Sequence, residues 1–277
     1  KFTFMHLHKT GGQSITDALL HCVKDAEQIG YHLPLRLLPE QAKSRPIIGV
    51  IRNPWDWYVS WYVFNNLRGV KNPLFSIVSR GKQAGFRETI KNLARYPEAT
   101  ASNETMKRSH KALLPEQFEN DGGAGFTKRC VREFDSPTEG YYSLLVRRML
   151  GEPTANVHLI RFESLEQDLL EVLDKLNVPE TEAISRCLSN QPKKNSSPRG
   201  HYSQYYDTDL SALIEEKEKG LVNRFGYSFN SPEIYEEFVS IEPGQRVKKV
   251  NGQRTSFLRV GDVKNVRHLQ TKVDALT

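Results

Sequence analysis

The first residues of the chain restrict its fold more than any other segment. Residues 2–7 form a short apolar run of β-prone residues, and a polar loop with two adjacent glycines follows. Ile15, Leu19, Leu20 and Val23 then recur at the spacing of an α-helix. This order predicts a strand, a tight loop and a helix, which is the opening unit of an α/β fold.

The same order of elements recurs further along the chain. Residues 46–51 predict a buried strand with an aromatic helix over 55–64, and residues 157–162 predict another strand followed by a leucine-rich helix. Residues 141–150 and 208–225 predict two more helices, and residues 65–140 predict helices and mobile loops inserted between strands. Strands that alternate with helices favour a parallel sheet with right-handed crossovers.

The composition predicts one main domain with an extension. A chain of 277 residues with 38% hydrophobic residues can bury one sizeable core. Residues 241–277 hold eight Lys or Arg against three Asp or Glu, and Asn251-Gly252 predicts the turn of a β-hairpin. We therefore expect the main domain over residues 1–235 and a basic, β-rich C-terminal extension over residues 236–277.

The charge and the cysteines limit the classes of function. A net charge of +6 favours an anionic ligand, but the basic residues are mostly mixed with acidic ones, which argues against nucleic acid. The sequence has no apolar run of about 18 residues, so we predict no membrane span in these residues. Cys22, Cys130 and Cys187 lack the spacing of a metal site, so we expect reduced thiols in a cytoplasmic protein.

The loop after the first predicted strand is a candidate anion site. Backbone amides at a strand-to-helix junction point outward, and the N-terminus of the helix attracts negative charge. Two glycines allow a phosphate to approach the backbone closely, while a lysine adds charge and two hydroxyls add donors. The residues are Lys9, Thr10, Gly11, Gly12, Gln13 and Ser14. The pattern GxxxxGK[ST] is absent, so this is not a Walker loop.

A second segment combines an arginine with a capped aromatic helix. Arg52 ends the predicted strand over 46–51, Pro54 and Asp56 begin the helix, and Ser60 follows two turns later. Arg52 can bind a phosphate with two parallel hydrogen bonds, and the Ser60 hydroxyl can join it. Taken alone, the segment fits a buried packing helix equally well, and we expect its three tryptophans to be packing residues.

Together, the two segments resemble the nucleotide-binding signatures of sulfotransferases that use 3′-phosphoadenosine-5′-phosphosulfate (PAPS). The version here is Lys-Thr-Gly-Gly-x-Ser with Arg-Asn-Pro-Trp-Asp-x-x-x-Ser-x-Tyr, which is typical of carbohydrate-type and many bacterial members, including heparan sulfate 6-O-sulfotransferase-like proteins. Weaker resemblance includes residues 161–165, 201–206 and 224–227.

The resemblance implies a P-loop-like parallel sheet flanked by helices, with PAPS as donor, PAP as product and no required metal. The loop from Lys9 to Ser14 would hold the 5′-phosphosulfate, and Lys9 would stabilise the leaving phosphate. Arg52 and Ser60 would bind the 3′-phosphate, and Arg199 is a second candidate ligand, with a solvated surface arginine as the alternative. His8 departs from the family, which usually has Pro or Gln before the lysine.

A general base must take the proton of the acceptor hydroxyl. The candidate histidines are His6, His8, His32, His110 and His201. We select His32, because many relatives carry Gly-x-His or Gly-His between the first helix and the second strand. An ordinary loop histidine is the alternative at this position.

The leading hypothesis is transfer of a sulfuryl group from PAPS to a hydroxyl of an acceptor, which the sequence leaves open among a sugar, a lipid or polyketide alcohol, a peptide tyrosine and a small phenol. A nucleotide kinase or other phosphotransferase is the first alternative, but it needs a Walker loop and acidic magnesium ligands. A non-catalytic PAP(S)-binding module is the second, and Lys9 argues against it. We expect a cytoplasmic location, or the Golgi lumen if an upstream anchor has been removed.

Overall fold

The computed structural model describes residues 2–67, 72–116, 126–134, 138–151, 154, 156–190 and 199–229. Three parallel strands, β1 (Thr3–Met5), β2 (Ile47–Ile51) and β3 (Val157–Arg161), form a sheet in the order β1-β2-β3. The predicted α/β class and all three predicted strands are confirmed. The predicted hairpin, and the whole extension over residues 236–277, lie outside the described residues.

Side chains of β2 alternate between two apolar cores, because successive residues of a strand point to opposite faces. Ile48 and Val50 pack with α1 (Gly12–Cys22), α10 (Leu165–Lys175) and α11 (Thr181–Asn190). Ile47 and Ile51 belong to the second core. Gly49 also faces that side, where Leu150 leaves no room for a Cβ atom.

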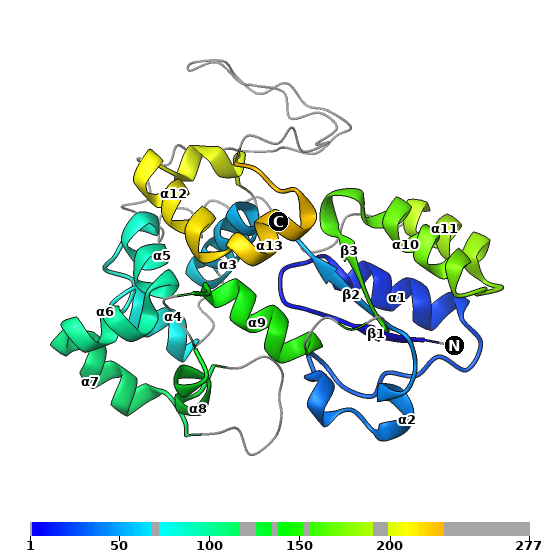
Figure 1. Cartoon of the computed structure of the whole chain (residues 1–277), viewed down its shortest axis with the longest axis horizontal. Helices are drawn as coiled ribbons and strands as arrows, with labels where there is room; N and C mark the ends of the chain where they lie inside the picture. The colour runs from blue at the N-terminus through cyan, green and yellow to red at the C-terminus, as the bar shows by residue number, and fades with distance from the viewer. Residues whose placement is uncertain are drawn as a thin grey trace, which may run out of the picture.

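The second core joins the sheet to a larger helical region, which Figure 1 shows beside the sheet. Its central members are α3 (Pro54–Leu67) and α9 (Tyr141–Leu150), and both agree with the predicted helices. The other elements are η1 (Leu35–Leu37), α2 (Glu40–Lys43), α4 (Pro73–Val78), α5 (Phe86–Ala94), α6 (Tyr96–Ser102), α7 (Glu104–Leu113), α8 (Lys128–Arg132), η2 (Phe162–Ser164), η3 (Tyr202–Tyr205), α12 (Thr208–Lys217) and α13 (Lys219–Phe225).

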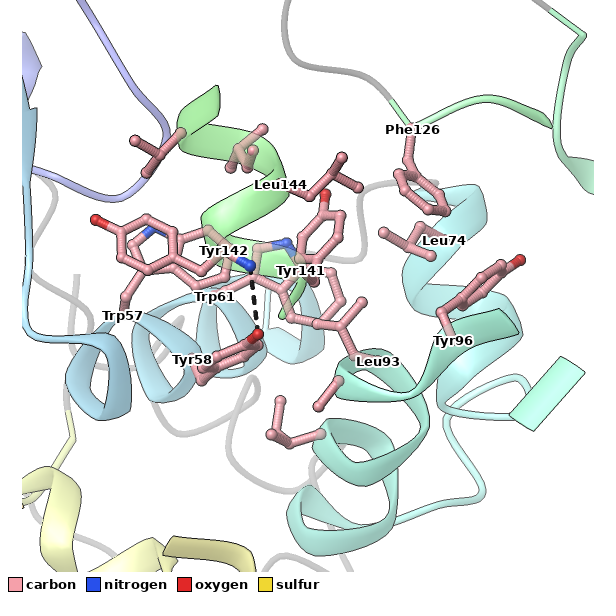
Figure 2. Packing of buried hydrophobic residues seen from close by; sticks show 14 of the residues in the cluster. Trp57, Tyr58, Trp61, Leu74, Leu93, Tyr96, Phe126, Tyr141, Tyr142 and Leu144 are labelled. Carbon is pink, nitrogen blue, oxygen red and sulfur yellow. Dashed lines mark hydrogen bonds between the residues drawn. The ribbon is translucent and has the colours of Figure 1, made fainter. Parts of the chain in front are cut away.

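Aromatic side chains pack α3 against α9 (Figure 2). The Trp57 ring stacks on Tyr142 with 4.4 Å between centroids, and it also lies parallel to the Trp61 ring. Trp55, Trp57 and Trp61 are all buried, which confirms the predicted packing role of the tryptophans.

No disulfide joins Cys22, Cys130 and Cys187, all of which the structure describes. Among the helices over the described ranges, none is both long enough and apolar enough to cross a membrane.

The helix expected over residues 208–225 is two helices, with the break at Glu218. The Glu218 carboxylate is buried, where it accepts hydrogen bonds from the Tyr58 hydroxyl (2.6 Å), the Ser143 hydroxyl and the backbone nitrogens of Tyr142 (3.1 Å) and Ser143 (2.9 Å). The helical spacing could not reveal the break, because these partners belong to α3 and α9. Burial raises the pKa of Glu218 despite its four donors.

We expect Glu218→Ala to lower the free energy of unfolding by about 3 kcal/mol or more, because it leaves several buried donors without an acceptor. Urea denaturation measures the change. Glu216→Ala, at an exposed position of α12, is the matched control and should change stability by less than about 0.5 kcal/mol. Equal stability of the two variants would contradict the structural role of Glu218.

Candidate functional site

The loop between β1 and α1 has an unusual backbone. Lys9 and Gly11 both have left-handed conformations, with φ of 62° and 72°. A lysine in this region is uncommon, and such strain is concentrated at functional sites. Gly11 caps α1 without a side chain, so the helix begins with backbone N–H groups that a side chain does not cap. These groups form an electropositive turn, and Lys9 adds a positive charge to the same loop.

Both glycines of the loop are required by close packing. A Cβ atom on Gly11 would lie 2.6 Å from the Phe162 ring, and one on Gly12 would lie 2.3 Å from the His6 ring. Any larger residue would therefore displace the loop from Phe162 of η2 or from His6. Thr10, next to these glycines, is also buried, and its hydroxyl donates to the Leu7 carbonyl at 2.9 Å.

The second sequence segment holds the loop in place. Trp57 Nε1 donates to the His8 carbonyl at 2.8 Å, and Arg52 Nη1 donates to the Lys9 carbonyl at 3.0 Å. The carbonyl groups of His8 and Lys9 therefore both accept hydrogen bonds from side chains of the second segment. Although they are far apart in the sequence, the two predicted motifs form one site.

Arg52 and Arg199 meet on a single buried carboxylate. Arg52 Nε donates to Asp56 Oδ2 at 2.6 Å, and Arg199 forms an ion pair with Asp56 Oδ1. Asp56 has no exposed surface, and both guanidinium groups are largely buried. Two guanidinium groups share one carboxylate, so these three side chains together carry one formal positive charge. Ser60 is also buried, one turn after Asp56 on α3.

Further contacts fix Arg52 at the end of β2. Its backbone nitrogen donates to the Tyr142 hydroxyl at 2.8 Å, and its guanidinium lies 4.2 Å from the centre of the Phe162 ring. Glu163 accepts from the backbone nitrogen of Asn53 at 2.6 Å, and burial raises the pKa of this carboxyl.

Three histidines stack next to the phosphate-loop candidate. The ring centroid of His32 lies 3.7 Å from that of His8 and 4.4 Å from that of His6. His32 Nδ1 lies 2.7 Å from the His6 carbonyl, which can only accept, so Nδ1 carries the proton. The neutral ring then has its lone pair on Nε2, the form that a general base requires.

Burial keeps this histidine stack neutral. Burial, together with the neighbouring His32, lowers the pKa of His6 to about 4 and that of His8 to about 3. Burial also lowers the pKa of His32, against the opposing effect of its bond to the His6 carbonyl. All three rings are therefore unprotonated at neutral pH.

The remaining candidate bases lie elsewhere. His110 is on α7, where its Nδ1 is 3.0 Å from the Tyr96 hydroxyl, and Figure 1 shows α7 at the opposite side of the molecule from β1. His201 caps η3 and contacts Ser203. Of the five histidines, the structure brings only His6, His8 and His32 to the loop.

Comparison with family models gives one match, to the sulfotransferase domain, over residues 19–196. The chain belongs to this family. The match covers more than half of the chain and confirms the predicted membership. It begins after Ser14, so the sulfotransferase assignment is independent of the phosphate-loop motif. Comparison with curated proteins and with solved structures found no significant match.

Sequence reasoning missed several side chains that position the candidate site. Asp56 was expected only to favour the start of a helix, yet it bridges two arginines. Phe162 and Glu163 lie in a segment of weak resemblance and Tyr142 lies in a predicted helix, and neither pattern indicates their contacts with Arg52 and Asn53. The Arg-Phe-Glu-Ser signature at residues 161–164 could have indicated the first two. Within the described ranges, no cluster of three or more His, Cys, Asp or Glu could hold a metal.

Proposed function

We propose that this chain transfers a sulfuryl group from PAPS to the hydroxyl of an acceptor. The family supports sulfuryl transfer. The choice of PAPS rests on the chemistry of the site, which offers a strained amide-rich loop, the ammonium of Lys9 and two guanidinium groups. A donor with phosphate groups at both ends of its ribose matches two separate positive regions.

In this proposal, the loop from Lys9 to Ser14 binds the 5′-phosphosulfate, and Arg52, Ser60 and Arg199 bind the 3′-phosphate. The acceptor oxygen attacks sulfur, so a new S–O bond forms while the S–O bond to the 5′-phosphate breaks. The acceptor proton passes to His32 Nε2, and PAP leaves. Lys9 stabilises the negative charge that develops on the 5′-phosphate.

One contact carries this proposal. Arg52 donates to the Lys9 carbonyl at 3.0 Å and pairs with Asp56, so one guanidinium links the loop to the second positive region. A ligand that reaches both regions would be oriented at both ends. Transfer of radiolabelled sulfate from PAPS to an added hydroxyl compound tests the reaction directly.

We expect Arg52→Ala to weaken PAP binding by about 2 kcal/mol or more, because a charge-assisted phosphate contact is lost. Isothermal titration calorimetry measures the affinity. Adenosine 5′-phosphosulfate, which lacks the 3′-phosphate, should bind poorly to the wild type and should lose little in the variant.

Arg87→Ala is the matched control, since Arg87 forms an exposed ion pair with Asp207. It should bind PAP as the wild type does. If Arg52→Ala stays folded and binds PAP with wild-type affinity, the 3′-phosphate assignment is wrong.

A further inference from the structure

Two of the three cysteines lie on helices that pack against each other. Cys22 is the last residue of α1, and Cys187 lies on α11. Both helices contribute to the same apolar core beside the sheet, and Figure 1 shows them side by side. Cys22 packs against this core, so its side chain is on the side of α1 that faces its neighbours.

A hydrogen bond brings the Cys22 thiol to the helical turn that precedes Cys187. Cys22 Sγ donates to the Ala183 carbonyl at 3.4 Å, across 161 positions of the chain. Cys187 lies one turn after Ala183 on α11, and helical side chains lean toward the N-terminus of their helix. The Cys187 side chain therefore leans toward the carbonyl that Cys22 contacts, and the two thiols are in hydrogen-bond contact with each other.

The two neighbouring thiols differ from the third in accessibility. Cys22 and Cys187 are both half-buried, so a small reagent can reach them, whereas Cys130 is buried on α8 in the other apolar core. Within the described ranges, no group of three or more His, Cys, Asp or Glu could hold a metal, so the pair is not part of a zinc-type site. Two accessible thiols in contact are instead suited to form a disulfide.

We propose that Cys22 and Cys187 are a reversible dithiol pair, which a small disulfide such as oxidised glutathione converts into an intramolecular disulfide between α1 and α11. The Cys187 sulfur attacks one sulfur of oxidised glutathione, and one reduced glutathione leaves. The Cys22 sulfur then attacks the Cys187 sulfur, so the new bond forms and a second reduced glutathione leaves. The two cysteines together lose two protons and two electrons, which the two glutathione thiols carry away.

The order of these two steps follows from the environment of Cys22. Burial, and then the hydrogen bond with Cys187, raise the pKa of the Cys22 thiol. A protonated thiol is a poor nucleophile, so Cys22 is suited to close the bond rather than to start the exchange. An excess of reduced glutathione reverses both steps.

The disulfide joins the two helices at a distance from the proposed donor site. Cys22 is at the C-terminal end of α1, roughly 16 Å from the loop end at about 1.5 Å per residue. A link between segments so distant in the sequence restricts the unfolded chain and stabilises the folded one. We expect oxidation to raise the melting temperature by at least about 4 °C and to leave PAP affinity unchanged within about twofold.

Incubation of the folded chain with oxidised glutathione, followed by alkylation and peptide mass spectrometry, tests the proposal. We expect the wild type to keep only Cys130 alkylated, with one peptide that joins Cys22 to Cys187, and dithiothreitol should restore all three thiols. Cys22→Ser should form no intramolecular disulfide, and its melting temperature should not rise with oxidised glutathione. Cys130→Ala is the matched control and should behave as the wild type does. Cys187→Ser replaces Cys22→Ser if the latter does not fold.

The same reaction in urea separates the folded contact from general thiol reactivity. The preference for this pair should disappear there, because an unfolded chain favours the shorter loops that Cys130 closes. A link to Cys130 in the folded protein, a bond between two chains, or separate glutathione adducts on Cys22 and Cys187 would overturn the proposal. A Cys22–Cys187 bond that leaves the melting temperature unchanged would show that it does not hold α1 to α11. None of these readouts requires PAP, so they stand apart from the proposed function.

Discussion

Replacement of Lys9 by alanine is expected to abolish measurable sulfuryl transfer. Lys9 is at the turn where β1 leads into α1, in a left-handed conformation with its carbonyl bonded to Arg52. Its Nζ lies 4.1 Å from the centre of the Phe64 ring, which holds the ammonium on the α3 side of the loop. Loss of a charge that stabilises a transition state costs about 3 kcal/mol or more, which is over 100-fold in rate.

Two further variants separate the charge from the backbone conformation. Lys9→Gly removes the ammonium but accommodates a φ of 62° without strain, so its loop should be at least as stable as that of the wild type. Lys9→Arg keeps the charge. We expect Lys9→Gly to be as inactive as Lys9→Ala and Lys9→Arg to retain part of the rate, measured as transfer of radiolabelled sulfate. Wild-type turnover in a folded Lys9→Gly protein would refute the role of Lys9.

Local sequence patterns predicted the three strands and several of the main helices. The three parallel strands are short apolar runs, and α1, α3, α9 and α10 follow helical spacing or capping residues. These signals come from a few neighbouring residues, and burial in a parallel sheet reinforces them. The two phosphate-type motifs could likewise be located, because each joins a strand end to a helix start.

Such local patterns could not predict contacts between distant segments of the chain. The pairing of Asp56 with Arg199 joins residues 143 positions apart, and the Tyr142 hydroxyl accepts from the Arg52 backbone nitrogen across 90 positions. The buried Glu218 interrupted a helix that looked continuous, because its partners lie on α3 and α9. No local spacing encodes these pairs, since packing of the helices brings them together.

The histidine stack shows both what could be predicted from the sequence and what required the structure. The family resemblance and the position of His32 in the chain selected it, but His6 and His8 lie in the segment after β1, and nothing local indicated that all three rings would meet. The contact with the His6 carbonyl fixes the protonated nitrogen of His32. If His32 is the base, as the resemblance predicts, Nε2 is the nitrogen that would accept the proton.

His32→Ala should lower turnover by about 100-fold or more while PAP binding persists, because the acceptor hydroxyl loses the group that takes its proton. The pH profile provides a second readout. Burial lowers the pKa of His32, so its neutral form predominates at pH 7. As the pH falls below the ordinary histidine value of about 6.5 and through the lowered pKa, the base becomes protonated and kcat/KM declines.

That acidic decline should be absent from the residual activity of His32→Ala, whereas His110→Ala should keep both the rate and the profile of the wild type. His110 is the matched control, since its ring contacts Tyr96 on the opposite side of the molecule. His32→Gln tests the positioning alternative, because an amide can bond to the His6 carbonyl but cannot accept the proton at neutral pH. If His32→Gln restores the wild-type rate, His32 only holds the loop and the base is another group; if it stays as slow as His32→Ala with unchanged PAP affinity, proton transfer at Nε2 is the contribution that was lost.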